Sequence, residues 1–448
     1  MRQNHINIKT RYEITRREFL WLASMSAAGL VTGCATNPVT GKSQFMLVSE
    51  DKEIQIDKQN CPHQFSADYG PSQDNTLNNY IDQTGKKIAS NTHRTHMPYS
   101  FRVVNAVYIN AYAFPGGSIA ATRGILLSLE NEGELASLLG HELGHINARH
   151  TARMMSNSLL TNAVVSGIST YAGTKGAAYS KITSQLGMIG AGALLASYSR
   201  DNEREADALG LQYMVKTGYN PKDFAGLMDM LNTMSKHKTN AMELLFATHP
   251  MSQERYDTAI KTIKTRYGSI ENSSVFRERY MDNTAKLRKI RGAVKQMQEG
   301  ENEIRRQRYT DAEAHFKEAL TQAPDDYAGL LMMAKCQIAQ KKYNHALRYV
   351  KKAEQVYPQE AQAHHLSGFI RLKQKDYDSA LMEFNRYAEL LPGNSNTIFF
   401  KGGCLEGMGR LKESASHYHK YLNLVNQGSY AKHSYKRLLE WGYIKPQQ

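Results

Sequence analysis

A spacing of 34 residues recurs through the last third of the chain and restricts its fold more than any other feature. The residues that keep this spacing are Tyr309, Tyr343 and Tyr377, Ala312, Ala346 and Ala380, and Pro324, Pro358 and Pro392. Small residues at fixed positions let the two helices of one unit approach closely, and a proline ends each unit. Because each unit buries its apolar face only against its neighbours, the spacing predicts an all-α solenoid.

This period, with small residues at helix crossings and proline at the unit end, is the signature of tetratricopeptide repeats. We expect about four repeats over residues 293–428, the last one degenerate, and a capping helix and tail over residues 429–448. The array has no chemistry of its own and presents a concave groove for peptides or partner proteins. Cys336 and Cys404 take the same helix position two repeats apart, which is too far for a disulfide.

The motif H-E-x-x-H at residues 141–145 carries the chemistry of the N-terminal part. Its flanks are good helix formers, so His141 and His145 lie one turn apart on one face and can hold one metal ion between them. Glu142 lies near that face, where it can reach a water molecule beside the metal. Two solvated histidines on a surface helix are the alternative for this motif alone, so a third ligand decides between them.

A second run of helix formers over residues 199–211 offers that ligand. Glu203 and Asp207 are four residues apart and share a face, whereas Glu205 points roughly 200° away from Glu203. Glu203 can therefore complete a site of two histidines and one glutamate, and Asp207 can accept a hydrogen bond from a ligand histidine. The alternative is a solvated acidic helix start.

Taken in order, these motifs resemble the M48 family of zinc metallopeptidases. The similarity runs from about residue 37 to 265 and includes N-A-Y-A-F-P-G-G at 110–117, H-E-L-G-H at 141–145, N-E-R-E-A-D at 202–207, and T-H-P at 248–250 with Arg255. The resemblance implies one Zn2+ per chain, held by His141, His145 and Glu203, with Glu142 as general base. It also implies that residues 34–285 form a mainly helical gluzincin-type domain with a small β-sheet. The whole chain is then α+β with an all-α solenoid.

Two segments near the metal site leave alternatives open. His249 either lies near the zinc, donating to the oxyanion or occupying the open position in a resting form, or forms a structural turn with Pro250 and Arg255. Residues 118–127 read as a strand beside the metal helix. In this family such a strand is an edge that binds substrate as an added strand, and the alternative is an ordinary core strand.

The first residues predict export from the cytoplasm. Arg16 and Arg17 resemble a twin-arginine signal, and residues 31–34 resemble a lipobox, so residues 1–33 are expected to be removed and Cys34 lipidated. We expect the protein in the periplasm, anchored to the inner leaflet of the outer membrane. Residues 156–199, rich in glycine and alanine, form either a lid over the active site or a membrane-contacting hairpin.

The formal net charge of +14 does not indicate nucleic acid, because the charges are interspersed and no nucleic-acid motif is present. By resemblance to the periplasmic BepA-type members of the family, the substrates are expected to be unfolded or misassembled envelope proteins. The repeats would bind these clients or the outer-membrane protein assembly machinery. The alternative function is a chaperone or assembly scaffold for outer-membrane proteins whose peptidase site is latent.

Overall fold

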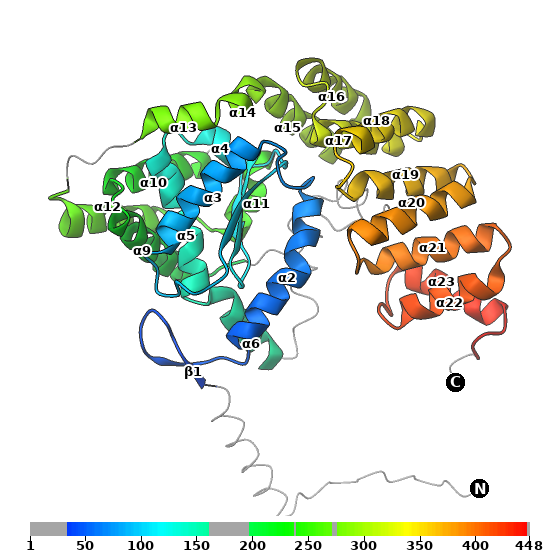
Figure 1. The fold of residues 1–448 in the computed structure, drawn as a ribbon, viewed down its shortest axis with the longest axis horizontal. Coiled ribbons are helices and arrows are strands. Elements are labelled where there is room, and N and C mark those ends of the chain that lie inside the picture. The colour runs from blue at the N-terminus through cyan, green and yellow to red at the C-terminus, as the bar shows by residue number, and fades with distance from the viewer. Residues whose placement is uncertain (1–33, 161–196, 237–238, 271–275, 446–448) are drawn as a thin grey trace, which may run out of the picture.

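The computed structural model describes residues 34–160, 197–236, 239–270 and 276–445. The predicted signal over residues 1–33 and residues 161–196 of the glycine-rich tract lie outside the described residues. Helices dominate, and small sheets occur in the N-terminal part, so the predicted fold class of α+β with an all-α solenoid is confirmed (Figure 1). Within the described residues, every helix is too short or too polar to cross a bilayer.

The N-terminal domain alternates helices with short strands. Its elements are β1 (Cys34–Thr36), β2 (Ser43–Phe45), α2 (Glu50–Ala67), α3 (Asn75–Ala89), β3 (Ser100–Val104), β4 (Ala111–Ala113), β5 (Ser118–Thr122), α4 (Arg123–Ser128), α5 (Glu132–Asn147), α6 (His150–Leu160), α9 (Arg200–Lys216), α10 (Pro221–Lys236), η2 (Asn240–Met242), α11 (Glu243–Thr248), α12 (Gln253–Tyr267), α13 (Arg277–Asn283) and α14 (Ala285–Lys289). Side-chain caps fix several helix starts, because the side chains of Ser49, Asp74 and Asn131 accept hydrogen bonds from first-turn backbone N–H groups.

The larger sheet has three strands in the order β3-β5-β4. β5 pairs in parallel with β3 and antiparallel with β4, so it is the central strand. The expectation of one strand over residues 118–127 that forms the sheet edge is therefore wrong in two ways. The strand ends at Thr122, whose hydroxyl accepts from the backbone N–H of Ile125 and caps α4. The strand at the end of the sheet beside α5 is β4.

Helices α5 and α9 cross with their backbones in contact because glycines lie at the crossing. A Cβ on Gly144 would lie 2.8 Å from the carbonyl oxygen of Ala206, and a Cβ on Gly210 would lie 2.7 Å from the amide nitrogen of His141. A larger side chain at either position would push the helices apart. This crossing sets the distance between the two sequence motifs, since α5 carries His141–His145 and α9 carries Glu203.

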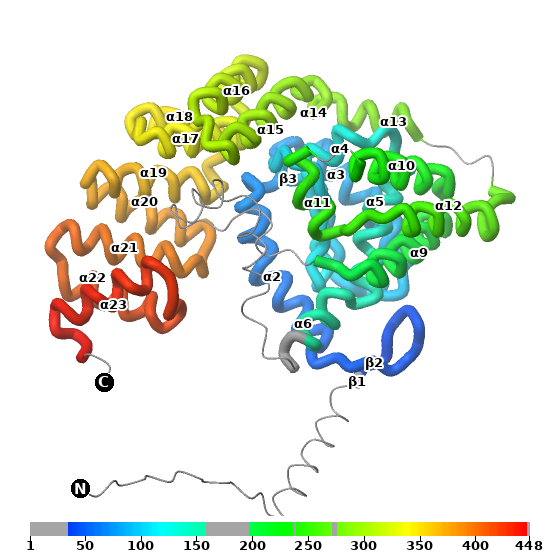
Figure 2. The backbone as a smooth tube through the Cα atoms, turned by 180° about the vertical axis from the view of Figure 1, so that it is seen from behind, coloured from blue at the N-terminus to red at the C-terminus, as the bar shows by residue number. Residues whose placement is uncertain are grey.

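The C-terminal domain is an array of antiparallel helix pairs (Figure 2). The pairs are α15 (Arg291–Arg305) with α16 (Tyr309–Gln322), α17 (Tyr327–Ala339) with α18 (Tyr343–Val356), α19 (Gln362–Lys373) with α20 (Tyr377–Leu390), and α21 (Ser395–Gly407) with α22 (Leu411–Leu422); α23 (Ser429–Glu440) packs on α22. A glycine on the first helix meets an aromatic ring on the second, as Gly368 meets Phe384. Cys336 and Cys404 are buried and free, as is Cys61.

The inner side of this array faces α2 (Figure 1, Figure 2). Residues 66–70, which we call the interdomain turn, contact the repeats directly. Tyr69 takes a left-handed conformation (φ 65°) and packs within the apolar core of the repeats. The ammonium group of Lys335 lies 4.4 Å from the centre of its ring. Glu360 accepts hydrogen bonds from the hydroxyls of Ser66 and Tyr327.

A buried ion pair makes a further contact between the domains. Arg123 at the start of α4 pairs with Asp326 at the start of α17, and its second N–H group donates to the other carboxylate oxygen at 3.2 Å. The side chains of Arg123 and Asp326 are 6% and 5% exposed. The two domains therefore share buried polar groups as well as apolar core.

Candidate metal centre

Three residues from α5 and α9 bring their ligand atoms together in the interior. The Nε2 atoms of His141 and His145 lie 3.0 Å apart. Glu203 places one carboxylate oxygen 3.2 Å from the Nε2 atom of His145 and the other 3.5 Å from that of His141. All three residues are buried.

These separations fit a metal ion bound at the centre of the group. Ligands about 2.0–2.1 Å from a tetrahedral zinc ion lie roughly 3.3 Å from one another, and the three separations in the site scatter around that value. Two imidazoles and one carboxylate are also the donor types that zinc prefers. The residues present therefore fit a zinc ion.

His249 joins the same cluster from the C-terminal end of α11. Its Nδ1 atom lies 3.1 Å from Glu203 Oε1 and 3.4 Å from His141 Nε2, so it stands at a fourth corner of the ligand group. Burial alone lowers the pKa of His249, but the charges of Glu203 and Glu142 outweigh it and raise this pKa.

Asp207 and Arg255 hold the ligands from behind. Asp207 Oδ1 lies 2.9 Å from the Nδ1 atom of His141, which leaves the Nε2 atom of that ring for the metal side. Arg255 donates to both oxygens of Asp207, at 2.5 and 2.8 Å, and contacts Glu203 at 2.5 Å. Burial raises the pKa of Glu203, but the charge of Arg255 outweighs it, so this pKa lies well below its ordinary value and the carboxylate stays ionised.

Glu142 sits beside the cluster without being part of it. Its Oε1 atom lies 3.8 Å from the Nε2 atom of His249, and its Oε2 atom is buried with no hydrogen-bond partner within the described residues. Burial raises the pKa of Glu142 above its ordinary value. A buried carboxylate with one oxygen free of hydrogen bonds and a raised pKa is suited to accept and release a proton.

Three further residues lie around the cluster, and the sequence did not predict their roles. His150 lies 2.9 Å from the Nδ1 atom of His145, and Glu205 lies 3.0 Å from the other nitrogen of His150. The ring of Tyr198 stacks on His145 at 3.7 Å between centroids. Glu205 does point away from Glu203, as the helix period predicted, but α6 lies on that side. A histidine five residues after the end of the motif was the available signal for His150.

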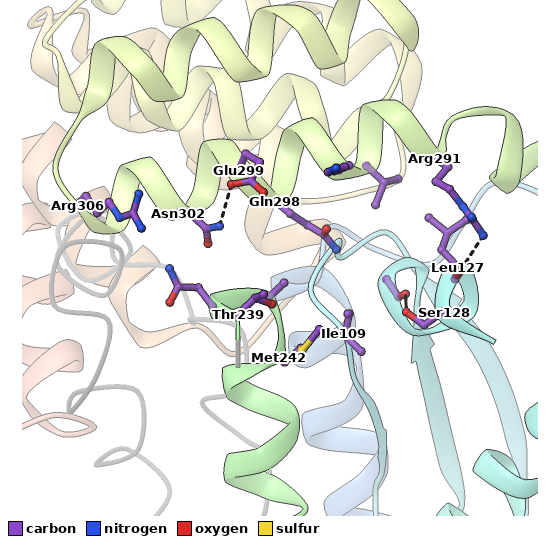
Figure 3. Close-up of a pocket in the computed structure, with 15 residues that line it drawn as sticks. Ile109, Leu127, Ser128, Thr239, Met242, Arg291, Gln298, Glu299, Asn302 and Arg306 are labelled. Atoms are coloured by element: carbon purple, nitrogen blue, oxygen red, sulfur yellow. Dashed lines mark hydrogen bonds between the residues drawn. The ribbon is translucent and has the colours of Figure 1, made fainter. Parts of the chain in front are cut away.

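A cavity of about 620 Å³ lies apart from the cluster, with α15 on one side and α4 and η2 on the other (Figure 3). Arg291, Gln298 and Asn302 line its α15 wall, and Thr239 and Met242 lie on the opposite wall. The helix η2, which belongs to this opposite wall, is followed by α11, which leads to His249. Arg305 on α15 also holds α11, because its guanidinium pairs with Glu243 at 2.8 Å. The first repeat helix thus supports the segment that carries His249.

Comparison with known proteins finds a family match in each part of the chain. Residues 75–264 match the model of Peptidase family M48, and residues 303–368 match a model of the tetratricopeptide repeat. The chain therefore combines a region that matches the M48 peptidase family with a region that matches the tetratricopeptide repeat. This confirms the resemblance seen in the motifs, and the family implies a metal in the site.

The chain is similar to a protein named beta-barrel assembly-enhancing protease. It is 31% identical to the one from Yersinia pestis over 194 residues, which are 42% of this chain and 39% of that protein. It is 29% identical to the one from Escherichia coli (strain K12) over 190 residues, 41% of this chain and 38% of that protein. Metalloprotease YcaL from the same strain is 29% identical over 246 residues, 53% of this chain and 93% of that protein. The chain thus spans about two fifths of the first two relatives.

Proposed function

We propose that the protein is a zinc-dependent endopeptidase of the bacterial periplasm that hydrolyses unfolded or misassembled envelope proteins. The observation that carries this proposal is the buried group of His141, His145 and Glu203 beside Glu142, whose Oε2 atom has no hydrogen-bond partner within the described residues. One zinc ion per chain, held by these three ligands, would polarise the scissile carbonyl and acidify a water molecule. The names of the relatives support proteolysis and a link to β-barrel assembly.

Glu142 would act as the general base and then as the general acid. It accepts the proton of the attacking water and passes it to the amine that leaves when the peptide bond breaks. Its raised pKa favours the second transfer, because a carboxyl group that holds its proton longer near neutral pH is a better donor to the amine. Asp207 and Arg255 keep His141 and Glu203 oriented during this cycle.

Substrate would bind in an extended conformation along β4. This strand ends the sheet and contacts α5, so a peptide paired with it runs past the metal ligands. Pairing through the main chain tolerates many sequences, which suits clients recognised by their unfolded state. The edge function that the sequence placed on β5 is therefore proposed for β4.

His249 supports a second candidate function, a chaperone or assembly scaffold with a latent peptidase site. Its Nδ1 atom stands at the fourth corner of the ligand group, so we propose that it would occupy the open metal position at rest. Its displacement would open the site. If His249→Ala raises basal cleavage, the histidine blocks the open position at rest. If cleavage falls, the histidine donates to the oxyanion. Unchanged turnover would leave only the structural turn.

The proposals for localisation and for binding partners are based on the N-terminal motifs and on the repeats. We propose export by the twin-arginine route, a lipid anchor on Cys34, and a place on the inner leaflet of the outer membrane. The repeats would hold clients or contact the outer-membrane assembly machinery.

The decisive experiment compares Glu142→Gln with the wild type on an unfolded outer-membrane protein. We expect the variant to keep one zinc per chain and to lose hydrolysis, because the ligands remain and the proton acceptor is gone. Glu134→Gln, the same substitution two turns earlier on α5, serves as the matched control and should cleave normally. Full activity of Glu142→Gln would refute the mechanism.

A further inference from the structure

A chain of hydrogen bonds runs from His145 away from the metal side of its ring. The Nδ1 atom of His145 lies 2.9 Å from the Nδ1 atom of His150, and the Nε2 atom of His150 lies 3.0 Å from Glu205 Oε2. His150 is fully buried, and Glu205 is partly exposed. The chain connects three helices, because His145, His150 and Glu205 belong to α5, α6 and α9.

The proton positions along these hydrogen bonds follow from the need for an unprotonated nitrogen on the metal side of His145. The Nε2 atom of His145 faces the other ligand atoms and must be unprotonated to bind a metal, so its Nδ1 atom carries the proton. That N–H group can donate only to an unprotonated Nδ1 atom of His150. His150 must then carry its own proton on Nε2, and it donates this proton to the carboxylate of Glu205. With one tautomer for each of the two imidazole rings, both N–H donors therefore have an acceptor.

We infer that His150 and Glu205 are positioning residues that fix the tautomer and orientation of His145 as a metal ligand. This inference rests on the proposed zinc peptidase function. His141 receives the same support from one carboxylate, Asp207, at 2.9 Å. His145 receives it through a second imidazole, since α6 places His150 between the ligand and the carboxylate.

The surroundings hold this chain in place. The left-handed conformation of Arg149 (φ 56°) separates α5 from α6 and turns His150 back towards His145. Tyr198 stacks on His145, and its hydroxyl lies 3.0 Å from that of Thr151 beside His150. The orientation of the His145 ring is thus fixed by one hydrogen bond and one stacked ring, while its Nε2 atom stays free for the metal.

The test measures zinc affinity of the full-length protein by competition with a chelator. His150→Leu removes the acceptor, and we expect affinity to fall about 10- to 100-fold, the usual cost of losing such a partner. His150→Gln offers an amide oxygen to the His145 N–H group and should restore most of the affinity. His365→Leu removes another fully buried histidine, in the repeats, and is the matched control that should bind zinc as the wild type does.

Glu205→Leu adds a readout that a merely structural role would not move. Because Glu205 acts through His150, the double variant with His150→Leu should bind zinc no more weakly than His150→Leu alone. Additive losses would overturn the inference. Equal zinc affinity of His150→Leu and wild type would overturn it as well, whereas a wild-type protein that binds no zinc would sink the proposed function with it.

A second measurement needs no variant. In the zinc-loaded wild-type protein, nitrogen-15 NMR of the imidazoles should show His145 protonated on Nδ1 and His150 protonated on Nε2. A proton on the Nδ1 atom of His150 would overturn the inference even if His150→Leu fails to fold.

Discussion

The ion pair between Arg123 and Asp326 should contribute to the stability of the whole molecule through the cost of leaving a charge unpaired. Asp326→Asn removes the negative charge but keeps an oxygen that can cap α17, where Asp326 accepts from the backbone N–H of Gly329 at 2.9 Å. The helix start is thereby preserved. The variant isolates the effect of stranding the Arg123 guanidinium between the domains.

The expected loss is about 3–5 kcal/mol of unfolding free energy, because breaking a buried pair leaves an uncompensated charge out of water. Both side chains are more than nine-tenths buried, so solvent screens the interaction little. Arg123→Met combined with Asp326→Asn leaves no charge at the contact. This pair of substitutions should recover most of the loss, although the bond from Arg123 Nε to the carbonyl of Asn105 is also removed.

Urea unfolding followed by circular dichroism measures these free energies, and the coupling comes from the double-mutant cycle. The loss of stability in Asp326→Asn should also persist at high salt, since a buried pair is screened less than a surface pair. A loss below about 1 kcal/mol would place the pair in the range of solvated surface ion pairs and refute the argument.

Three other outcomes follow from the structure. Gly144→Ala should lower zinc affinity, because its Cβ would lie 2.8 Å from the Ala206 carbonyl and spread α5 from α9; chelator competition measures this, and unchanged affinity would contradict it. Burial raises the pKa of Asp68 to about 6 from an ordinary 3.8, so its stabilising effect is full below about pH 4 and is lost as pH rises through 6. Relative to Asp68→Asn, the wild type should lose at most about 3 kcal/mol of unfolding free energy over that interval. Parallel pH profiles of the two proteins would refute this. A chain ending at residue 285 should bind a hydrophobic dye, because Tyr69 and Val107 lose their cover in the repeats; a compact, dye-free fragment would contradict it.

The repeats were the most predictable part of the fold, because their pattern repeats a local contact. Gly368 is small for the reason that the 34-residue spacing indicates: it faces the Phe384 ring of the same helix pair. Each unit packs on its sequence neighbours, so a short window of sequence contains most of the relevant partners. The same holds for His141 and His145, whose relation depends only on the pitch of one helix.

Partners that are distant in sequence were harder to predict. In the sequence, nothing distinguishes His150 from other histidines, because its partner Glu205 lies on a different helix, α9. Glu205 itself has the pattern of a residue on a solvated helix face. The end of β5 at Thr122 was missed because the following residues are as apolar as a strand, and only the capping hydroxyl marks the change. β4 is three residues long, too short for a period to be visible.

The interdomain turn determines which parts of this protein can be exchanged by recombination. Tandem arrays are usually regarded as interchangeable modules, but here Tyr69 lies in the core of the array and Glu360 accepts a hydrogen bond from Ser66. An array grafted from elsewhere would leave that tyrosine without its pocket and the Arg123 guanidinium without its carboxylate. A successful exchange must therefore carry α2 with the turn that follows it, together with residue 123. The inherited unit is the array plus the surface it encloses, so the peptidase domain and the repeats of this chain are expected to have diverged together.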